Sequence, residues 1–527
     1  MRESYDAIII GGGHNGLVSA AYLAKAGRRV LVLEQRHVLG GAAATEEVFP
    51  GFKVNTGAGD AGLFQDKIVQ DLSLEAHGLE FRQSPVACFA PQPGGEALTL
   101  WRDEQQTVAG LRRFSPRDAE RFPAFRRELN RMARILREML LLTPPDVMAR
   151  DLRDLVAWGG VGLKLKRLGK REMMEFLRVL PLAVAEYLDE WFESDALKGL
   201  LAAAGVWGNQ LGPRGAGTAM MLLYQHASGF PAGRFVAGGI GQLSAALAAA
   251  AQGFGAEIRT GQAVSRVLLD NGRGTNGPAA AGVVLAGGRE IRAGVVVSNA
   301  DPRRTFFDLV GAQNLDPGFM RHVRNLIYRG CTAKVNLALS GLPQFNGQTD
   351  PAQLGGHILI GPSPEYVERA YDEAKYGRYS KNPVLDIVIP TVLDPALAPE
   401  GQHIMSITVQ YAPYHLRQGD WETGREALAE AVIEALAAYA PGLRDLILHR
   451  QVLTPLDWEQ RYGLTEGSIH HGQMSLDQVL VLRPVPGWSR YRAPVDNLFL
   501  CGAGAHPGGG VTGAPGYNAA REVLASS

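Results

Sequence analysis

YDAIIIGGGHNGLVSAAYLAKAGRRVLVLE, residues 5–34, is the stretch that decides the fold. A short apolar run leads into the glycine-rich turn at 11–16, an apolar helical pattern follows, and a second apolar run ends at Glu34. A strand, a glycine turn, a helix and a parallel strand, in this order, form a dinucleotide-binding unit. We therefore predict an α/β protein built around such a unit.

The three spaced glycines of this turn have separate physical roles. Gly11 permits the tight turn, Gly13 lets the backbone approach a pyrophosphate, and Gly16 lets the helix pack close to the strand. The N-terminus of the helix then offers free N–H groups to phosphate. Glu34 stands where an acid accepts hydrogen bonds from a ribose. These four residues are our first predicted ligands of a dinucleotide.

Composition excludes several classes of function. Lys plus Arg equals Asp plus Glu at 53 each, which gives no support for a nucleic-acid partner. The cysteines at 88, 331 and 501 are far apart and form no CxxC, so we predict neither a redox dithiol nor a metal site. No targeting segment and no apolar run of about 18 residues is present, which predicts a cytoplasmic protein without a transmembrane helix.

Changes of pattern along the chain predict an interrupted cofactor domain. We expect its parts at 1–100, 234–330 and 461–527, because glycine turns next to apolar runs recur there. Helical periodicity dominates the insert at 101–233. Segment 331–460 alternates strands at 332–339, 384–389 and 403–410 with a helix at 421–439, which predicts a sheet-plus-helix substrate domain.

Six segments together resemble the phytoene desaturase-like FAD-dependent oxidoreductases. They are GGGHNGLVSAAYLAKAG (11–27), EQRHVLGGAAATEE (34–47), VVVSNADPRR (295–304), PTVLDPALAPEGQH (390–403), MSLDQ (474–478) and CGAGAHPGGGVTGAPG (501–516). Within this family, the chain is most similar to the pyridine nucleotide-disulfide oxidoreductase domain-containing protein 2 group and to the FAD-dependent carotene ketolases. The resemblance implies FAD, an interrupted Rossmann-type domain of the glutathione-reductase kind, and a hydrophobic, isoprenoid or carotenoid-like substrate. Because a CxxC is absent, we exclude disulfide reduction.

The same resemblance implies a set of FAD contacts beyond the first turn. Arg36, Gly40, Gly41 and Ala42 would line the pyrophosphate and ribityl chain, and Val264 would meet the adenine. In the tail, a strand, a glycine loop and a helix beginning near residue 511 would bring a helix N-terminus to the flavin, where it stabilises negative charge on the reduced ring. The tail residues implied are Gly502, Gly504, Gly510, Val511 and Thr512.

Flavin accepts the hydride at N5, so the protein needs to supply orientation and a base. His506, in the tail loop, is our first candidate, and His470 and Tyr411 follow; His471 and His226 are further candidates. His470 and His471 are neighbours, and neighbours on a strand point apart, so we expect at most one of them to face a substrate.

We therefore expect dehydrogenation or oxidation of a hydrophobic substrate, with oxygen or a quinone reoxidising the flavin. Two alternatives remain open: a regulatory or interaction protein with a structural FAD, and a carotenoid ketolase that adds oxygen. The basic stretch at 164–171 has apolar neighbours, a pattern that is typical either of a solvated helix face or of a peripheral membrane contact.

Overall fold

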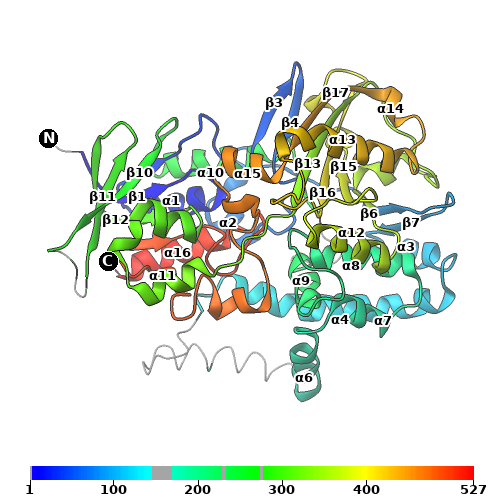
Figure 1. Cartoon of the computed structure of the whole chain (residues 1–527), viewed down its shortest axis with the longest axis horizontal. Coiled ribbons are helices and arrows are strands. Elements are labelled where there is room, and N and C mark those ends of the chain that lie inside the picture. Colours follow the sequence, from blue (N-terminus) through cyan, green and yellow to red (C-terminus); the bar gives the residue numbers. More distant parts are fainter. Residues whose placement is uncertain are drawn as a thin grey trace.

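The computed structural model describes residues 3–144, 159, 169–227, 233–272, 274 and 277–526. Figure 1 shows two lobes side by side, with both ends of the chain in the same lobe. Each lobe is built on a seven-stranded sheet, and a band of helices lies beneath the second lobe. The chain passes repeatedly between the lobes.

The first lobe holds the sheet that the opening stretch predicts. Its strand order is β10-β11-β12-β1-β2-β9, with β18 pairing β12 beside β11. The strands β9, β2, β1, β12 and β18 are parallel, while β10 and β11 form an antiparallel extension. Their bounds are β1 Ser4–Ile10, β2 Val30–Leu33, β9 Glu257–Arg259, β10 Val264–Asp270, β11 Ala279–Leu285, β12 Glu290–Ser298 and β18 Leu498–Leu500. Because parts far apart in the chain build one parallel sheet, the interrupted Rossmann-type domain is confirmed.

Small side chains let three helices of this lobe pack closely. Helix α1 contacts both α10 and α16, and Gly516 stands where the backbones of α16 and α1 meet. A Cβ on Gly516 would lie 2.2 Å from the carbonyl oxygen of Asn15. These helices and the smaller elements of the lobe are α1 His14–Lys25, α2 Asp66–Asp71, β5 Phe81–Arg82, β8 Phe235–Val236, α10 Gly241–Gly253, α11 Pro317–Arg324 and α16 Ala514–Ser526. The strands β3 Thr45–Phe49 and β4 Phe52–Asn55 form a hairpin that packs against the second lobe (Figure 1).

The second lobe contains the sheet expected for segment 331–460, which we call the substrate sheet after that prediction, in the order β17-β13-β16-β15-β14-β6-β7. Its strands are β6 Val86–Pro91, β7 Ala97–Trp101, β13 Thr332–Leu339, β14 His357–Ile360, β15 Val384–Val388, β16 His403–Gln410 and β17 Ile447–Leu453. β6 and most of β7 lie within segment 1–100, which we expected in the cofactor domain, yet β6 pairs with β14. Strand pairing is a non-local choice, so the local pattern of these residues did not reveal the partner.

Helices cover both faces of the substrate sheet. Helix α13 packs on one face, whereas α8 and α12 pack on the other. The insert supplies most helices of this layer, as its periodicity predicts. The bounds are α3 Glu104–Leu111, α4 Pro116–Leu140, α6 Lys170–Val179, α7 Val184–Asp189, α8 Asp195–Val206, α9 Thr218–Gln225, α12 Pro364–Lys375, α13 Trp421–Ala437, α14 Leu443–Leu446 and α15 Pro455–Tyr462.

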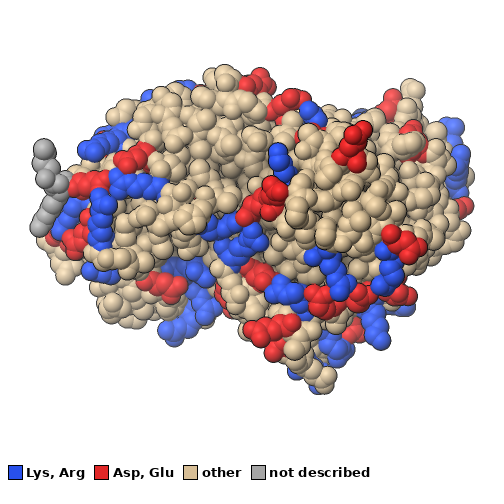
Figure 2. Space-filling model, turned by 90° about the horizontal axis from the view of Figure 1, so that it is seen from above, with Lys and Arg blue, Asp and Glu red and all other residues tan. Residues whose placement is uncertain are grey.

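Surface charge is mixed in sign. Figure 2 shows lysine and arginine interspersed with aspartate and glutamate over the face that it presents. Among the described residues, no helix has both the length and the apolar character that crossing a bilayer requires. The basic stretch considered for membrane contact falls mostly outside the described residues, since only 169–171 of it are included.

Candidate functional site

A cavity of about 620 Å³ joins the two lobes. At one end it is lined by the glycine turn after β1 and by the loop after β2. At the other end its walls are one face of the substrate sheet and the helix α8. Parallel strands present their carboxyl ends to ligands in this way, so the cavity lies where the fold class places a cofactor.

The glycine turn is shaped as its spacing predicts. Gly11 has φ +96°, a conformation that favours glycine. A Cβ on Gly13 would lie 2.8 Å from the side-chain nitrogen Nδ2 of Asn299, and one on Gly16 would lie 2.2 Å from the carbonyl oxygen of Gly11. Gly11 and Gly13 line the cavity, whereas Gly16 lies behind it and sets the approach of the helix.

Glu34 ends β2 and lines the cavity with its carboxylate. One oxygen accepts a hydrogen bond from the backbone N–H of Gly12 at 2.7 Å, and the other accepts from the N–H of Arg36 at 2.8 Å. Each carboxylate oxygen has a second lone-pair site, so Glu34 can still accept from a ribose hydroxyl. The residue therefore ties the first glycine turn to the loop after β2.

The loop after β2 brings a second glycine pair against the first. The N–H of Gly40 donates to the carbonyl of Gly12 at 2.8 Å, and a Cβ on Gly41 would lie 3.4 Å from the Cα of Gly13. Gly40, Gly41 and Ala42 all line the cavity, as does Val264 at the start of β10. Sequence reasoning grouped these residues, and the structure brings them to one wall.

Arg36 is held at this wall by an acid and a ring. Its guanidinium pairs with the carboxylate of Glu46 at 2.9 Å and lies 4.8 Å from the ring centroid of Tyr462. Burial raises the pKa of Glu46, but hydrogen bonds from Arg36 and Thr56 outweigh it, so the net shift is downward. One guanidinium nitrogen of Arg36, Nη1, is buried with no partner among the described residues.

The tail loop closes the cavity from the other side, although only part of it faces inward. Gly510 and Val511 line the cavity. Gly502 and Gly504 instead lie against the backbone of Asn299 and the ring of Pro302, where a Cβ would approach to 2.7 and 2.3 Å. Thr512 is fully buried behind the loop, and its hydroxyl accepts a hydrogen bond from the N–H of Ala514, the first residue of α16.

The expected FAD can be tested against these contacts. Buried polar atoms without a partner among the described residues lie along the cofactor end of the cavity, namely Nε2 of His14, Nη1 of Arg36 and Nε of Arg304. Buried polar groups are normally hydrogen-bonded, so such a row indicates a polar ligand. The two glycine turns leave no room for a Cβ, Glu34 can accept from a ribose, and arginines offer cationic donors. These features fit a flavin dinucleotide.

Two of the three catalytic candidates lie away from the cavity. His506 is buried, and its Nε2 contacts the carbonyl of Met139 at 3.0 Å. Tyr411 is buried too, and its hydroxyl donates to the carbonyl of Leu211 at 2.6 Å. Neither side chain is among the residues that line the cavity, so both connect loops to the helical layer.

His470 lies at the cavity, and one of its ring nitrogens has no partner among the described residues. Its Nε2 lies 3.2 Å from the carbonyl of Trp207, an acceptor, so this nitrogen carries the proton of the neutral ring. Burial lowers the pKa of His470 to about 4, so the ring is neutral at pH 7. The lone pair of Nδ1 has no partner among the described residues, and it lies against the backbone of Gly509 in the tail loop.

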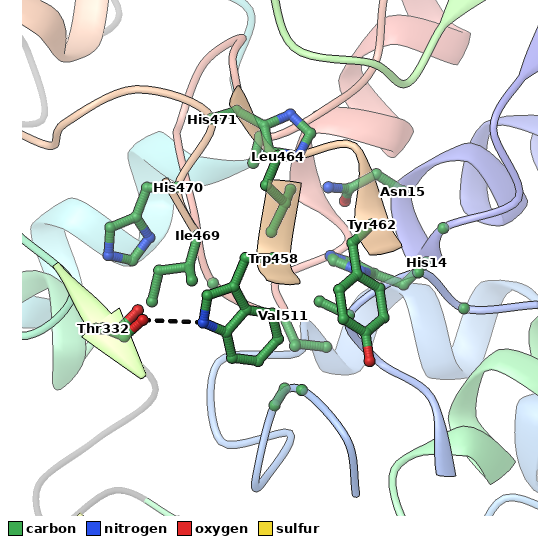
Figure 3. Close-up of a pocket in the computed structure, with 18 of the residues that line it drawn as sticks. His14, Asn15, Thr332, Trp458, Tyr462, Leu464, Ile469, His470, His471 and Val511 are labelled. Atoms are coloured by element: carbon green, nitrogen blue, oxygen red, sulfur yellow. Dashed lines mark hydrogen bonds between the residues drawn. The ribbon is translucent and has the colours of Figure 1, made fainter. Parts of the chain in front are cut away.

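His471 also lines the cavity, contrary to our expectation that only one of the pair would. The expectation assumed a strand, whereas His471 has φ +56° and belongs to a turn. Figure 3 shows the two rings pointing away from each other, among Ile469, Leu464 and Trp458. Burial lowers the pKa of His471 to about 4, and His226, another lining residue, shows the same direction for the same reason.

Sequence reasoning missed the polar floor of the cavity, which we define as Asp60, Thr332, His357, Asp386 and Thr408. Four of these stand on the substrate sheet, on the face opposite α13. The sequence carried a signal, because polar and apolar residues alternate in these strands although both faces are covered. A buried strand face with polar residues is costly unless they serve a purpose.

His357 is the centre of the polar floor. Its Nδ1 lies 2.8 Å from a carboxylate oxygen of Asp386, and its Nε2 lies 2.8 Å from one of Asp60. Burial lowers the pKa of His357, but the two carboxylates outweigh it and raise that pKa well above its usual value. The imidazole is thus a fixed cation. Among the described residues, no group of three or more His, Cys, Asp or Glu could hold a metal ion.

Comparison with known proteins agrees with this geometry. The family model described as flavin containing amine oxidoreductase matches residues 16–524. The chain is 38% identical to pyridine nucleotide-disulfide oxidoreductase domain-containing protein 2 of Rattus norvegicus, over 99% of this chain and 94% of that protein. It is 30% identical to one of the subunits of limonene dehydrogenase from Castellaniella defragrans, over 98% and 94%. The fold is similar to an oxidoreductase from Methanosarcina mazei, with a TM-score of 0.63, 18% identity and coverage of 98% and 99%.

Proposed function

Because the chain belongs to the family of flavin-containing amine oxidoreductases and uses FAD, we propose that it dehydrogenates or oxidises a hydrophobic small molecule of isoprenoid type. The observation that carries the proposal is the continuous cavity, which runs from the dinucleotide turn to a chamber walled by α8. A relative at 30% identity is named as part of a limonene dehydrogenase, and limonene is an apolar isoprenoid. The apolar wall that α8 gives this chamber, next to a flavin site, suits such a molecule.

The cofactor contacts form part of this proposal. Gly11, Gly13 and Gly41 would leave room for the pyrophosphate, Glu34 would accept from the ribose, and Arg36 would supply charge. Val264 would meet the adenine, and Gly510 with Val511 would lie at the flavin end. Bound there, FAD supplies hydride acceptance at N5. The chain's own task is to orient the substrate, exclude water and take up a proton.

For the proton, we propose His470. The neutral ring holds its proton on Nε2 against Trp207, so Nδ1, which lies against Gly509 of the tail loop, would be the nitrogen that takes up the proton. The hydride and the proton together account for the two hydrogens that a dehydrogenation removes. His506 and Tyr411 would act as positioning residues, since they bind the backbone of Met139 and Leu211 rather than the cavity.

The acceptor and the setting complete the proposal. Oxygen or a quinone would reoxidise the cofactor, and the three cysteines, which form no disulfide, suit the reducing cytoplasm. Contact with a membrane surface would give access to apolar substrates, and the stretch proposed for it is at 164–171.

Anaerobic titration of the FAD-loaded protein tests the proposal. Isoprenoid hydrocarbons, alcohols and amines are added in turn, and bleaching of the flavin absorption band is recorded. We expect at least one isoprenoid to bleach the band, and mass analysis of its product to show loss of two hydrogens. A purified protein that takes up no FAD would overturn the proposal, and a product that gains oxygen would favour the ketolase alternative.

The His470→Gln variant tests the base. Glutamine retains a hydrogen bond to Trp207 but cannot accept a proton, so we expect slower bleaching with an unchanged FAD content. General base catalysis contributes roughly 100- to 10,000-fold, which sets the scale of the loss. His506→Gln is the contrasting variant. If His470→Gln bleaches as fast as the unmodified protein, His470 is not the base.

A further inference from the structure

One wall of the substrate chamber is charged although the other is apolar. The apolar wall comes from the end of α8, where Leu200, Ala203, Ala204 and Trp207 line the cavity. The opposite wall is the polar floor, and Asp386 lies near its middle, directly paired with Thr408 of the next strand. A chamber for a plain hydrocarbon needs no ionised group, because carboxylates lose hydration against an apolar ligand.

The arrangement around His357 leaves one carboxylate oxygen unused. Both nitrogens of His357 are taken, one by each carboxylate. The second oxygen of Asp60 accepts from the N–H of Gly62 at 2.9 Å. No described residue donates to the second oxygen of Asp386, and its side chain is 20% exposed although it lies inside the molecule. That exposed surface faces the cavity, which Asp386 lines.

A second polar group in the same wall lacks a partner. The hydroxyl of Thr332 is buried, lines the cavity and has no hydrogen-bond partner among the described residues. It stands on β13, which pairs with β16, the strand of Thr408. Figure 3 shows Thr332 beside Trp458, whose indole N–H donates to the backbone carbonyl of Thr332 and leaves the hydroxyl unbound. β16 separates β13 from β15, so Thr332 marks a second polar point of this wall, apart from Asp386.

Nearby cations do not neutralise the free oxygen by direct contact. Lys334, on the same face of β13, donates its ammonium to the carbonyl of Gly57. Arg102 donates to the carbonyl of Gly233, and Arg234 pairs with Asp66 at 2.7 Å. The thiol of Cys88 also lines the cavity, and burial raises its pKa so that it stays neutral. Asp386 thus keeps a negative oxygen for a donor from the ligand.

We propose that the chamber takes an amphipathic molecule, whose apolar body packs on α8 and whose hydrogen-bond-donating head group, a hydroxyl or an ammonium, binds Asp386. The inference rests on the proposed function and narrows its substrate class. The head group donates to the free carboxylate oxygen, and the hydroxyl of Thr408, which is the register partner of Asp386, adds a contact. An unsubstituted hydrocarbon leaves the free oxygen of Asp386 unsatisfied.

Matched ligands on the FAD-loaded protein test this assignment. Decane, 1-decanol and 1-decylamine share one chain length, and their binding is followed by the change in the flavin absorption spectrum. A hydrogen bond to an ionised group contributes about 1.5–3 kcal/mol, so we expect the alcohol or the amine to bind roughly 10- to 100-fold more tightly than the alkane. The two polar arms show whether a neutral or a charged donor is preferred.

Variants separate the role of Asp386 from general damage. Asp386→Asn should remove most of the preference for the polar ligands, while Asp445→Asn, at an exposed acid of α14, should leave it unchanged. Thr408→Val covers the case in which Asp386→Asn does not fold, and it should reduce the preference by roughly 2- to 10-fold. Equal binding of alkane, alcohol and amine, or a preference that persists in these variants, overturns the inference. If the inference is overturned in this way but isoprenoid hydrocarbons still bleach the flavin, the proposed function stands and only this inference fails.

Discussion

Single residues of the glycine turn decide whether the dinucleotide fits. Gly16 lies at the point where α1 approaches the strand β1, and its missing side chain allows that approach. The carbonyl oxygen of Gly11 lies where a Cβ would be, and a backbone atom cannot move away as a flexible side chain can. The turn therefore depends on the absence of one atom.

Gly16→Ala should reduce FAD binding and stability together. The added methyl would lie 2.2 Å from the oxygen of Gly11, and overpacking of this kind costs about 1–3 kcal/mol. FAD content after reconstitution and the melting temperature are the measurements. Gly110→Ala is the matched control, because Gly110 lies in α3 with open space around its Cα. A Gly16→Ala protein that retains FAD as well as the control would contradict the role given to this glycine.

His357 provides a pH-dependent prediction at the same scale. Its raised pKa means that its charged form contributes stability below about pH 6.5, which is lost as the pH rises through the folded-state pKa. The pKa of Asp60 is lowered, because the contacts with His357 outweigh burial, so its contribution is present above about pH 4 and is lost on acidification. The pairing of His357 with Asp60 therefore contributes most to stability between about pH 4 and pH 6.5.

His357→Gln should consequently lower the melting temperature most between about pH 4 and pH 6.5. The difference from the unmodified protein should shrink at pH 3 and at strongly alkaline pH. Thermal melts across this range measure it, with His77→Gln, at an exposed histidine, as the control. A difference that grows toward alkaline pH would show that the imidazolium does not provide the stability.

At the scale of elements, a capping residue links two helices of the helical layer, α4 and α8. Ser115 caps α4, and its hydroxyl accepts from the N–H of Asp118 at 3.0 Å. The carboxylate of Asp118 then accepts from the N–H groups of Glu193 and Ser194, which precede α8. Ser115 therefore begins α4, and its hydroxyl also donates to the carboxylate of Glu193, just before α8.

Ser115→Ala should destabilise the protein by about 1 kcal/mol, the usual value of an N-cap. Ser194→Ala is a close control, since Ser194 occupies the N-cap position of α8 without making a side-chain cap bond. Denaturant unfolding of both variants measures the difference. Equal stability of the two variants would mean that the cap of α4 contributes nothing beyond a helix-start preference.

Elements also show how far sequence reasoning reached. The strands β13 and β16 and the helix α13 begin where their patterns predict, because apolar periodicity is local information. The pairing of β6 with β14 was not predictable in this way, since hydrogen bonds between strands join residues far apart in the chain. For the same reason, Asp60 and Asp386 gave no sign that they would meet at one histidine.

At the scale of the whole molecule, the cavity couples the two lobes. Asp60 lies in the loop after β4, whereas His357 and Asp386 stand on the substrate sheet. The ion pair of His357 with Asp60 therefore joins the N-terminal part of the chain to that sheet. FAD contacts would add to this connection along the first lobe. Binding to the folded state alone raises stability by mass action.

FAD should therefore raise the melting temperature of the whole chain more than FMN does. At 100 times the Kd, a ligand adds about 2.7 kcal/mol. FMN lacks the adenosine half, so it gives up the contacts proposed at Glu34 and Val264. Thermal shift titrations with each cofactor measure the difference, and equal shifts would contradict the extended binding mode.

Residues 5–34 by themselves determined that a dinucleotide binds, because spacing of glycines and apolar runs is local and imposes one backbone path. With the segments that resemble flavoproteins, they also indicated FAD and an interrupted domain, which the sheet and the family confirm. Only the tertiary structure decided which histidines face the cavity, that β6 joins the substrate sheet, and that a charged floor opposes α8. Burial and long-range pairing set these features, and neither is a property of any short stretch of chain.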